Sequence, residues 1–272
     1  MGFLFLAVAC SLAIGMVFKW AALQHLDRLR LLTVNYGTGA ALALLLLWTT
    51  GEGHGPLSPS LIGLGVFTGA LFIGGFHLLS LATERAGMGL ALGVMRLSVV
   101  VPVAVSWTVW RDVPTPLQQA GLVVACGALA LLAWPARAER AAGRGTASVL
   151  AALFVVGGVA DVLLKTFDER FGVQVPDAAF LALVFATACL VGCAGLLRRA
   201  TPEAPADDRV YVAGAVLGVV NYGSAVFLLE AVARMRGTVV FPLNNIAIVV
   251  GSALLGRWVW HEPIGRRNRV GL

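Results

Sequence analysis

Apolar runs of bilayer length recur along the whole sequence, and they constrain the fold more than any other feature. The hydrocarbon core of a bilayer is about 30 Å thick, and roughly 20 residues of helix cross it. Backbone polar groups find no water there, so only helices and closed barrels span it. The runs do not show the alternating polar and apolar pattern of a barrel strand. They cover residues 2–22, 31–48, 61–82, 87–110, 117–134, 148–164, 178–197, 210–229 and 237–255.

Composition supports the same interpretation. The sequence is 59% hydrophobic and 12% charged over 272 residues, whereas a soluble domain carries about 25% charged residues. We therefore predict an all-α, polytopic membrane protein, a helical bundle without a soluble domain. Three glycine pairs at a spacing of four predict close helix packing inside it. They are Gly65 with Gly69, Gly89 with Gly93, and Gly214 with Gly218.

The end of the sequence looks like a second copy of residues 87–122, displaced by 150 positions. The landmarks that coincide are Gly87 with Gly237, Val99 and Val100 with Val249 and Val250, Trp110 with Trp260, Asp112 with Glu262, and Gly121 and Leu122 with Gly271 and Leu272. Lys19 and Lys165 also close corresponding runs, as expected of one unit written twice. Chance similarity between two apolar runs of biased composition stays open as the alternative.

A repeat of five helices predicts how the chain is organised. An odd number of spans reverses the unit that follows, so the two units would be inverted relative to each other. We expect a first repeat at 1–134, a basic linker at 135–146 and a second repeat at 147–272. A tenth helix should begin near Arg266, close to where the sequence stops. The second repeat is therefore expected to be truncated, unless this is a nine-helix variant.

Basic residues exceed acidic residues by six, and most of the excess lies in the short connections. This distribution fits the charge bias of cytoplasmic loops better than a nucleic-acid patch. Alternate loops hold twelve basic residues against five, which predicts an amino terminus outside the cell. The expected partners are membrane lipid and a small-molecule substrate, with a homodimer left open and no nucleic acid. The four cysteines lie inside apolar runs without a metal or redox spacing, so we expect no metal, cofactor or disulfide.

Two charged residues lie deep inside predicted spans, where a charge is costly and marks a candidate functional site. Arg96 lies nine residues into its run, and its partner should be a carboxylate or a ring of carbonyl groups. Snorkelling to the interface along a tilted helix is the alternative. Asp161 is the only carboxylate well inside a predicted span, so we expect it to neutralise Arg96 or to carry a coupling proton. Lys165 follows four residues later on the same helix face, in the favourable order for an ion pair.

Other polar residues are candidates for a substrate or coupling pathway. Lys19 and Lys165 end their runs, where lysines are more often interface anchors than ligands. His77 could titrate near neutral pH, although a lone histidine is more often a packing residue. Binding and interhelical hydrogen bonding explain the remaining candidates equally well. These are Asn221, Tyr222, Asn244 and Asn245. Pro102 and Pro242 each remove a backbone hydrogen bond inside a span, so helix breaks are expected at both.

Several stretches carry a resemblance to a known family. They are RLSVVVPVAVSWTVWRDVPT at 96–115, QQAGLVVACGALALL at 118–132, and the run from Asn221 to Pro263, which contains FPLNN at 241–245. Together with Lys19 late in the first run, they resemble the drug/metabolite transporter superfamily of ten-helix, EamA-like carriers. The resemblance implies two EamA-type units in inverted repeat around a central cavity, working by alternating access. It also implies a bacterial inner-membrane protein. The apparent lack of a tenth helix departs from the family, and so does the expected orientation, because its members often have both termini in the cytoplasm.

The sequence therefore favours a secondary active or exchange transporter of small organic metabolites or drugs. No Walker motif for ATP hydrolysis is present, and neither H-E-x-x-H, G-x-S-x-G nor paired intramembrane carboxylates occur, so we do not expect an enzyme. The alternative is a membrane scaffold or sensor that transports nothing, or an inactive truncated carrier.

Overall fold

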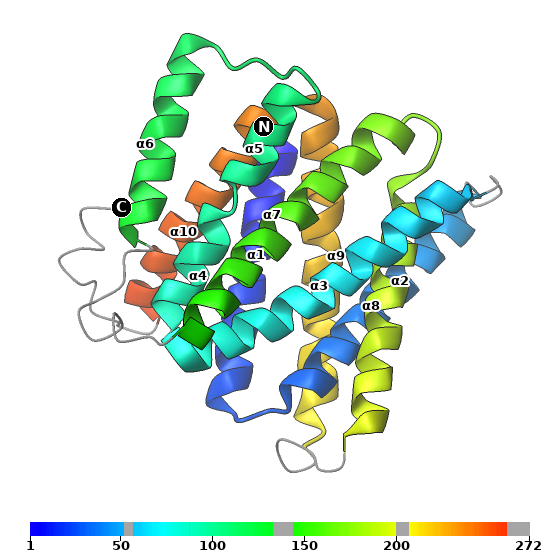
Figure 1. Ribbon diagram of the computed structural model, residues 1–272. Helices are drawn as coiled ribbons and strands as arrows, with labels where there is room; N and C mark the ends of the chain where they lie inside the picture. The colour runs from blue at the N-terminus through cyan, green and yellow to red at the C-terminus, as the bar shows by residue number, and fades with distance from the viewer. Residues whose placement is uncertain (52–56, 87, 133–143, 200–206, 260–272) are drawn as a thin grey trace. The chain divides into compact units, whose positions relative to one another are not determined.

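A computed structural model of the chain describes residues 1–51, 57–86, 88–132, 144–199 and 207–259. Every regular element in these ranges is an α-helix (Figure 1). The helices are α1 (Gly2–Leu23), α2 (Arg28–Thr50), α3 (Pro59–Ala86), α4 (Met88–Leu97), α5 (Val100–Thr108), α6 (Pro116–Leu132), α7 (Arg144–Phe171), α8 (Asp177–Arg198), α9 (Arg209–Arg234) and α10 (Gly237–Val259). Within the described ranges, eight segments are long and apolar enough to cross a membrane. The predicted all-α, polytopic membrane protein is confirmed.

Most predicted runs match a helix closely, but α7 is longer than predicted. The run was expected to end at residue 164, and α7 continues to Phe171. The apolar pattern marks the part of a helix that suits hydrocarbon, whereas backbone hydrogen bonding carries the helix further into charged sequence. Lys165 therefore lies inside α7 and not at its end.

The fourth run is two helices, because the chain is interrupted at residues 98–99 between α4 and α5. Pro102 has no N–H to donate to the carbonyl group of Ser98, four residues earlier, and its ring crowds that group. The Ser98 carbonyl accepts instead from the N–H of Val101, at 2.9 Å, in a tighter turn. Both pieces still form one candidate span, from Leu90 to Thr108.

Pro242 does not break α10, contrary to the sequence prediction. The helix runs from Gly237 through Pro242 to Val259 without interruption. Pro242 lies in the second turn, so only the first turn of the helix precedes the missing hydrogen bond. Proline is tolerated in membrane helices where neighbouring groups satisfy the freed backbone.

The chain forms two compact units. The first unit comprises Met1–Ile73 and Thr166–Ala233, and the second comprises Gly74–Lys165 and Arg234–Leu272. Their boundaries fall inside α3 and α7, so each unit takes segments from both halves of the sequence. The compact units therefore do not coincide with the two predicted sequence repeats. The inverted repeat stays a prediction. Most of the basic linker at 135–146 and the expected start of a tenth helix lie outside the described residues.

Glycines bring the helices of the first unit into close contact, as two of the predicted pairs indicate. A Cβ atom on Gly65 or Gly69 of α3 would lie less than 3 Å from atoms of α8. The same is true of Gly214 and Gly218 of α9 against α2. Both glycines of the third pair, Gly89 and Gly93, lie in α4. Because glycine has no side chain, these four residues let α3 approach α8 closely and let α9 approach α2 closely.

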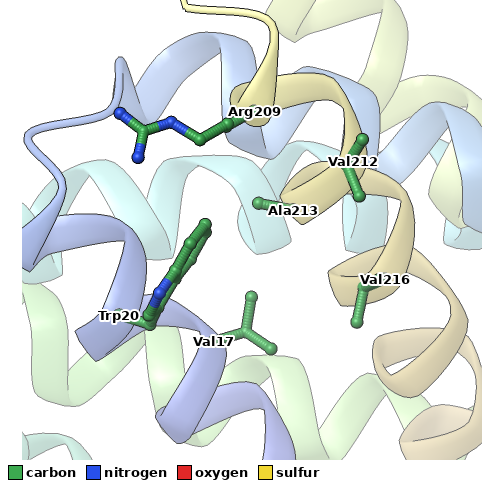
Figure 2. A pocket seen from close by; sticks show the side chains of 6 residues that line it. All are labelled: Val17, Trp20, Arg209, Val212, Ala213 and Val216. Carbon is green, nitrogen blue, oxygen red and sulfur yellow. The ribbon is translucent and has the colours of Figure 1, made fainter.

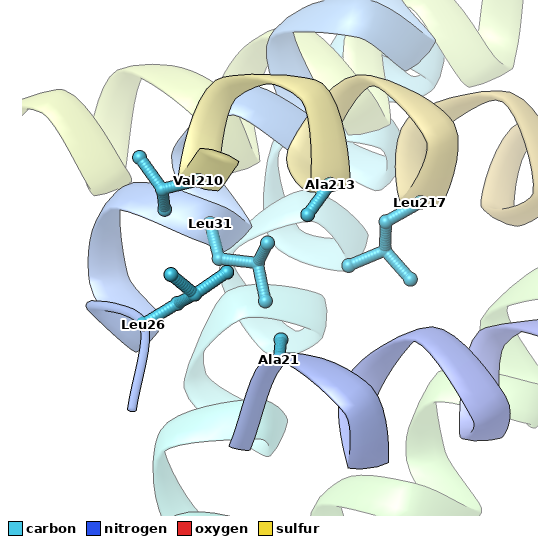
Figure 3. Packing of buried hydrophobic residues seen from close by; sticks show 6 residues of the cluster. All are labelled: Ala21, Leu26, Leu31, Val210, Ala213 and Leu217. Atoms are coloured by element: carbon cyan, nitrogen blue, oxygen red, sulfur yellow. The ribbon is translucent and has the colours of Figure 1, made fainter. Parts of the chain in front are cut away.

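A hollow and a packed cluster lie where α1 meets the start of α9 in the first unit. The α1–α9 groove has a volume of about 300 Å³ (Figure 2). It is lined by Val17, Trp20, Arg209, Val212, Ala213 and Val216. Beside it, the buried cluster consists of Ala21, Leu26, Leu31, Val210, Ala213 and Leu217 (Figure 3). Ala213 belongs to both, and Val17 packs against the cluster, so the groove rests on a tightly packed base.

The close approach of α3 to α8 gives a stability prediction. A Cβ atom on Gly69 would lie 2.4 Å from the backbone oxygen of Val184, which cannot move aside as a flexible side chain would. We expect Gly69→Ala to lower the free energy of unfolding by about 1–3 kcal/mol. The matched control is Gly63→Ala on the same helix, where nothing lies within 4 Å. Unfolding in detergent measures both, and equal stabilities of the two variants would contradict the packing role.

Candidate functional site

The break between α4 and α5 packs on a glycine pair of α7. A Cβ atom on Gly157 would lie 2.8 Å from the Ser98 hydroxyl oxygen. One on Gly158 would lie 3.1 Å from the Ser98 carbonyl oxygen and 2.6 Å from the Cβ atom of Val101. The interrupted backbone therefore lies directly against α7, about one turn before Asp161. Arg96 lies two residues before the break, and its charge interacts with that of Asp161 on α7.

Arg96 has partners on two other helices of the second unit. Its Nη1 atom donates to the side-chain oxygen of Asn245 on α10, at 3.3 Å. The Asn245 amide nitrogen donates to the backbone oxygen of Phe241, at 3.0 Å, and this bond fixes the orientation of the amide. The charges of Arg96 and Asp161 also act on each other. Arg96 thus binds an amide and interacts electrostatically with the carboxylate expected for it, and the three residues form what we call the Arg96 cluster.

The Arg96 cluster lies well inside the spans. Arg96 is six residues from the start of its candidate span and twelve from the end, or about 9 Å and 18 Å along a helix. Asn245 is eight residues from the start of a span that runs from Gly237 to Gly256. Its side chain is 5% exposed, whereas Arg96 and Asp161 are half-buried. A cation, an anion and an amide therefore lie at hydrocarbon depth, where each polar group needs an internal partner.

A second polar group gathers at the start of α10, and sequence reasoning missed its central residue. Asp112 lies in the turn after α5, where its N–H donates to the Ser106 carbonyl oxygen. Its carboxylate accepts from the N–H of Gly237, the first residue of α10, at 2.9 Å. The Lys165 ammonium lies 3.9 Å from the same oxygen atom. An anion at a helix start satisfies an N–H that has no partner in the helix and opposes the helix dipole favourably.

The Asp112 carboxylate also explains where Lys165 lies. The lysine was expected to anchor at the interface or to pair with Asp161, whereas its side chain is only 4% exposed and forms an ion pair with Asp112. Arg236 reinforces this contact by donating to the Val113 carbonyl oxygen at 2.9 Å. The sequence signal for Asp112 was that an acidic residue directly follows the fourth apolar run. Its partner at position 237 is too far along the chain for spacing to reveal.

Three buried polar atoms near these groups have no hydrogen-bond partner among the described residues. They are the hydroxyl oxygens of Ser106 and Thr238 and the amide oxygen of Asn244. These side chains are 0%, 4% and 7% exposed, respectively. A Cβ atom on Gly237 would lie 2.4 Å from the Ser106 hydroxyl, so this hydroxyl faces the start of α10. Unpaired groups at such burial are costly, which makes them candidates to bind water or a polar ligand.

The predicted polar residues of the first unit form a separate group. The Asn221 amide nitrogen on α9 donates to the side-chain oxygen of Asn35 on α2, at 3.1 Å. The Tyr222 hydroxyl oxygen is buried without a hydrogen-bond partner among the described residues. Its ring meets Phe185 of α8 edge-on, with centroids 5.9 Å apart. The sequence left two explanations for Asn221, binding and interhelical hydrogen bonding, and the structure contains the interhelical hydrogen bond.

Two predicted pathway residues lie outside both groups. His77 is exposed on α3 and makes none of the described contacts with the Arg96 cluster. Lys19 is half-buried near the end of α1, in the first unit. Among the residues whose placement is described, no group of three or more His, Cys, Asp or Glu side chains could hold a metal ion.

Fold and composition define the class of the protein as an integral, multi-pass helical membrane protein. No family model matches the chain. An uncharacterized protein of Haemophilus influenzae is 25% identical to it over 281 residues, covering 99% of this chain and 93% of the relative. A protein with a solved crystal structure superposes with a TM-score of 0.75 at 17% identity, covering 99% of this chain and 91% of that one. These matches extend over nearly the full length, and the structural match shows the fold alone.

The electrostatic interaction between Arg96 and Asp161 can be tested by a double-mutant cycle on stability. Each of Arg96→Gln and Asp161→Asn leaves one charge without its opposite at hydrocarbon depth, whereas the double variant removes both. We expect a coupling energy of about 1–3 kcal/mol in detergent unfolding. The control combines Arg96→Gln with Glu169→Gln, an exposed acid on the same α7, and should be additive. Additivity in the test pair as well would mean that the two charges do not stabilise each other.

Proposed function

We propose that this protein is a membrane carrier that moves small organic metabolites or drugs by alternating access, as a secondary active or exchange transporter. The observation that carries the proposal is the Arg96 cluster, in which a cation binds an amide and interacts electrostatically with a carboxylate inside the spans. Ionisable residues at that depth most often belong to substrate or proton pathways. The cluster lies in a chain composed almost entirely of spanning helices, which leaves the membrane interior as the place where it acts.

The interrupted helix supports a carrier over a static bundle. Broken spans bring backbone groups to the binding sites of secondary transporters, where their irregular backbone faces protein or water. The break at 98–99 lies two residues from Arg96 and packs on the small Gly157 and Gly158. Because glycines have no side chain, the helices that pack on them can slide with little steric cost. The break also provides a point where α4 and α5 can tilt independently.

In this proposal the residues of the second unit have distinct roles. Arg96 and the amides of Asn244 and Asn245 bind polar groups of the substrate. Asp161 exchanges a proton, so that its charge balances Arg96 in one state and is neutral in the other. Asp112 holds Lys165 and the start of α10 and thereby positions the helix that carries the amides.

The family assignment and the location belong to the same proposal. The resemblance to EamA-like drug/metabolite transporters supports the carrier, and the bacterial relative supports a bacterial inner membrane. We propose no enzymatic activity, and export is the expected direction. The alternative of a scaffold or sensor predicts the same fold without flux.

Transport in proteoliposomes tests the proposal. Vesicles loaded with the pH dye pyranine are exposed in turn to small organic acids, amines and zwitterions, with empty vesicles as background. We expect at least one class to move protons with it, and Asp161→Asn to reduce this pH-driven flux to background while exchange of preloaded substrate remains. The matched control is Glu169→Gln on the same helix, which should behave as wild type.

Two outcomes would contradict the proposal. Absence of flux for every class, with the protein folded and inserted, would favour the scaffold. Flux whose pH dependence survives Asp161→Asn would remove the coupling role of that carboxylate.

A further inference from the structure

The α1–α9 groove is a hollow in the apolar surface, and it has one polar end. Figure 2 shows the Trp20 ring and the α9 side chains facing each other across it, with the Arg209 guanidinium at its edge. Trp20, Val212 and Val216 are 42%, 68% and 48% exposed, so the lining is accessible from outside the protein. The bilayer is the surrounding medium for such a face.

The depth of the groove matches the part of a bilayer where headgroups meet acyl chains. Arg209 is the first residue of α9, and Val216 lies seven residues further, about 10 Å along the helix. Trp20 is three residues from the end of α1. Tryptophan is enriched at this boundary, where its ring is amphipathic. The groove thus runs from the interface into the hydrocarbon, in the direction that a lipid tail takes.

The polar end is a guanidinium held in a fixed orientation. Arg209 Nε and Nη2 donate to the Asp207 carboxylate, at distances down to 2.7 Å, and Nη1 donates to the Gln24 side-chain oxygen at 2.8 Å. Hydrogen bonds from Arg209 hold the pKa of Asp207 below its ordinary range, so the carboxylate stays charged at neutral pH. The Arg209 side chain is still 58% exposed.

The hydrogen bonds of Arg209 leave it able to bind a phosphate. A guanidinium has five N–H donors in a planar fork. One on Nε, one on Nη2 and one on Nη1 are used by Asp207 and Gln24 within the described residues. One N–H on each terminal nitrogen remains, and guanidinium N–H groups bind phosphate oxygen atoms.

We propose that the α1–α9 groove is a binding site for one glycerophospholipid, with an acyl chain along Val212, Ala213 and Val216 and the phosphate on Arg209. The occupant follows from the combination of an apolar channel, an interfacial tryptophan and an oriented cation in one membrane-spanning surface. A second protein copy would fill the channel but would not require a cation at its end. This site is independent of the transport proposal, since it lies wholly within the first unit.

Native mass spectrometry tests the acyl-chain part. Dioleoyl phosphatidylglycerol is added in increasing amounts to the intact protein in detergent. The protein is then released from the micelles in the spectrometer, and the fraction that carries one lipid is measured. Val216→Phe fills the groove and should weaken this first binding about tenfold, or 1.4 kcal/mol. The matched control is Val219→Phe, also on α9 and 53% exposed but outside the lining, which should bind as wild type. Thermal unfolding establishes that both variants are folded.

The phosphate part is tested by comparing lipids with identical tails. Wild type should prefer dioleoyl phosphatidylglycerol and dioleoyl phosphatidylcholine over dioleoylglycerol, which lacks the phosphate. Arg209→Gln should abolish that preference, whereas Arg170→Gln, at the exposed end of α7, should keep it. The proposal would be overturned if wild type bound dioleoylglycerol as tightly as the two phospholipids. It would also be overturned if Val216→Phe and Val219→Phe weakened lipid binding equally. A dimer that Val216→Phe dissociates, with lipid binding unchanged, would also overturn it in favour of a second copy.

Discussion

Every polar group that this chain carries into hydrocarbon must find its partner inside the protein, because lipid offers none. Helices satisfy the backbone, and Pro102 interrupts one of them four residues after Ser98. The freed Ser98 carbonyl is taken up in a tight turn, and the interruption packs on Gly157 and Gly158 of α7. Arg96 and Asp161 interact electrostatically in this part of the unit, and α10 completes the group with Asn245.

The second unit combines satisfied and unsatisfied polar groups. Asp112 binds the start of α10 and Lys165, and these contacts fix the positions of the helices. Asn245 is held by a bond at each end of its amide. In contrast, Asn244 and the nearby hydroxyl groups keep buried oxygen atoms without partners among the described residues. A rigid frame that presents unused hydrogen-bonding groups is the arrangement of a binding site, and packing alone does not account for it.

Much of the fold could be predicted from apolar run length alone, because hydrocarbon thickness imposes it. Gly65 and Gly69 also predicted a close helix contact correctly, since a missing side chain has a local and readable consequence. The boundaries and interruptions of the helices were harder to predict. The end of α7 lies beyond its apolar run, and Pro242 lies in a continuous helix, because hydrogen bonding and neighbouring groups decide both.

The candidate site could be predicted in part. Arg96 and Asp161 stood out because charge is rare at that depth, and in the structure the two charges interact. Asp112 was missed because it lies outside the apolar runs and acts on a residue 125 positions away. His77 stood out for its residue type, but it lies exposed on α3. Depth in the membrane was thus a better guide than residue type, and long-range pairing required the structure.

Transport by alternating access requires that the buried polar groups of the second unit meet water inside the spans, and cysteine accessibility tests this requirement most directly. Asn244→Cys and its neighbour Leu243→Cys are each introduced into cysteine-free protein in sealed proteoliposomes and treated with a membrane-impermeant maleimide. Leu243 is 41% exposed and Asn244 only 7% exposed, so simple exposure predicts faster labelling at 243. An aqueous pathway predicts the reverse, with 244 labelled and 243 protected by lipid. Labelling at 243 alone, or at neither position, would show that this requirement is not met.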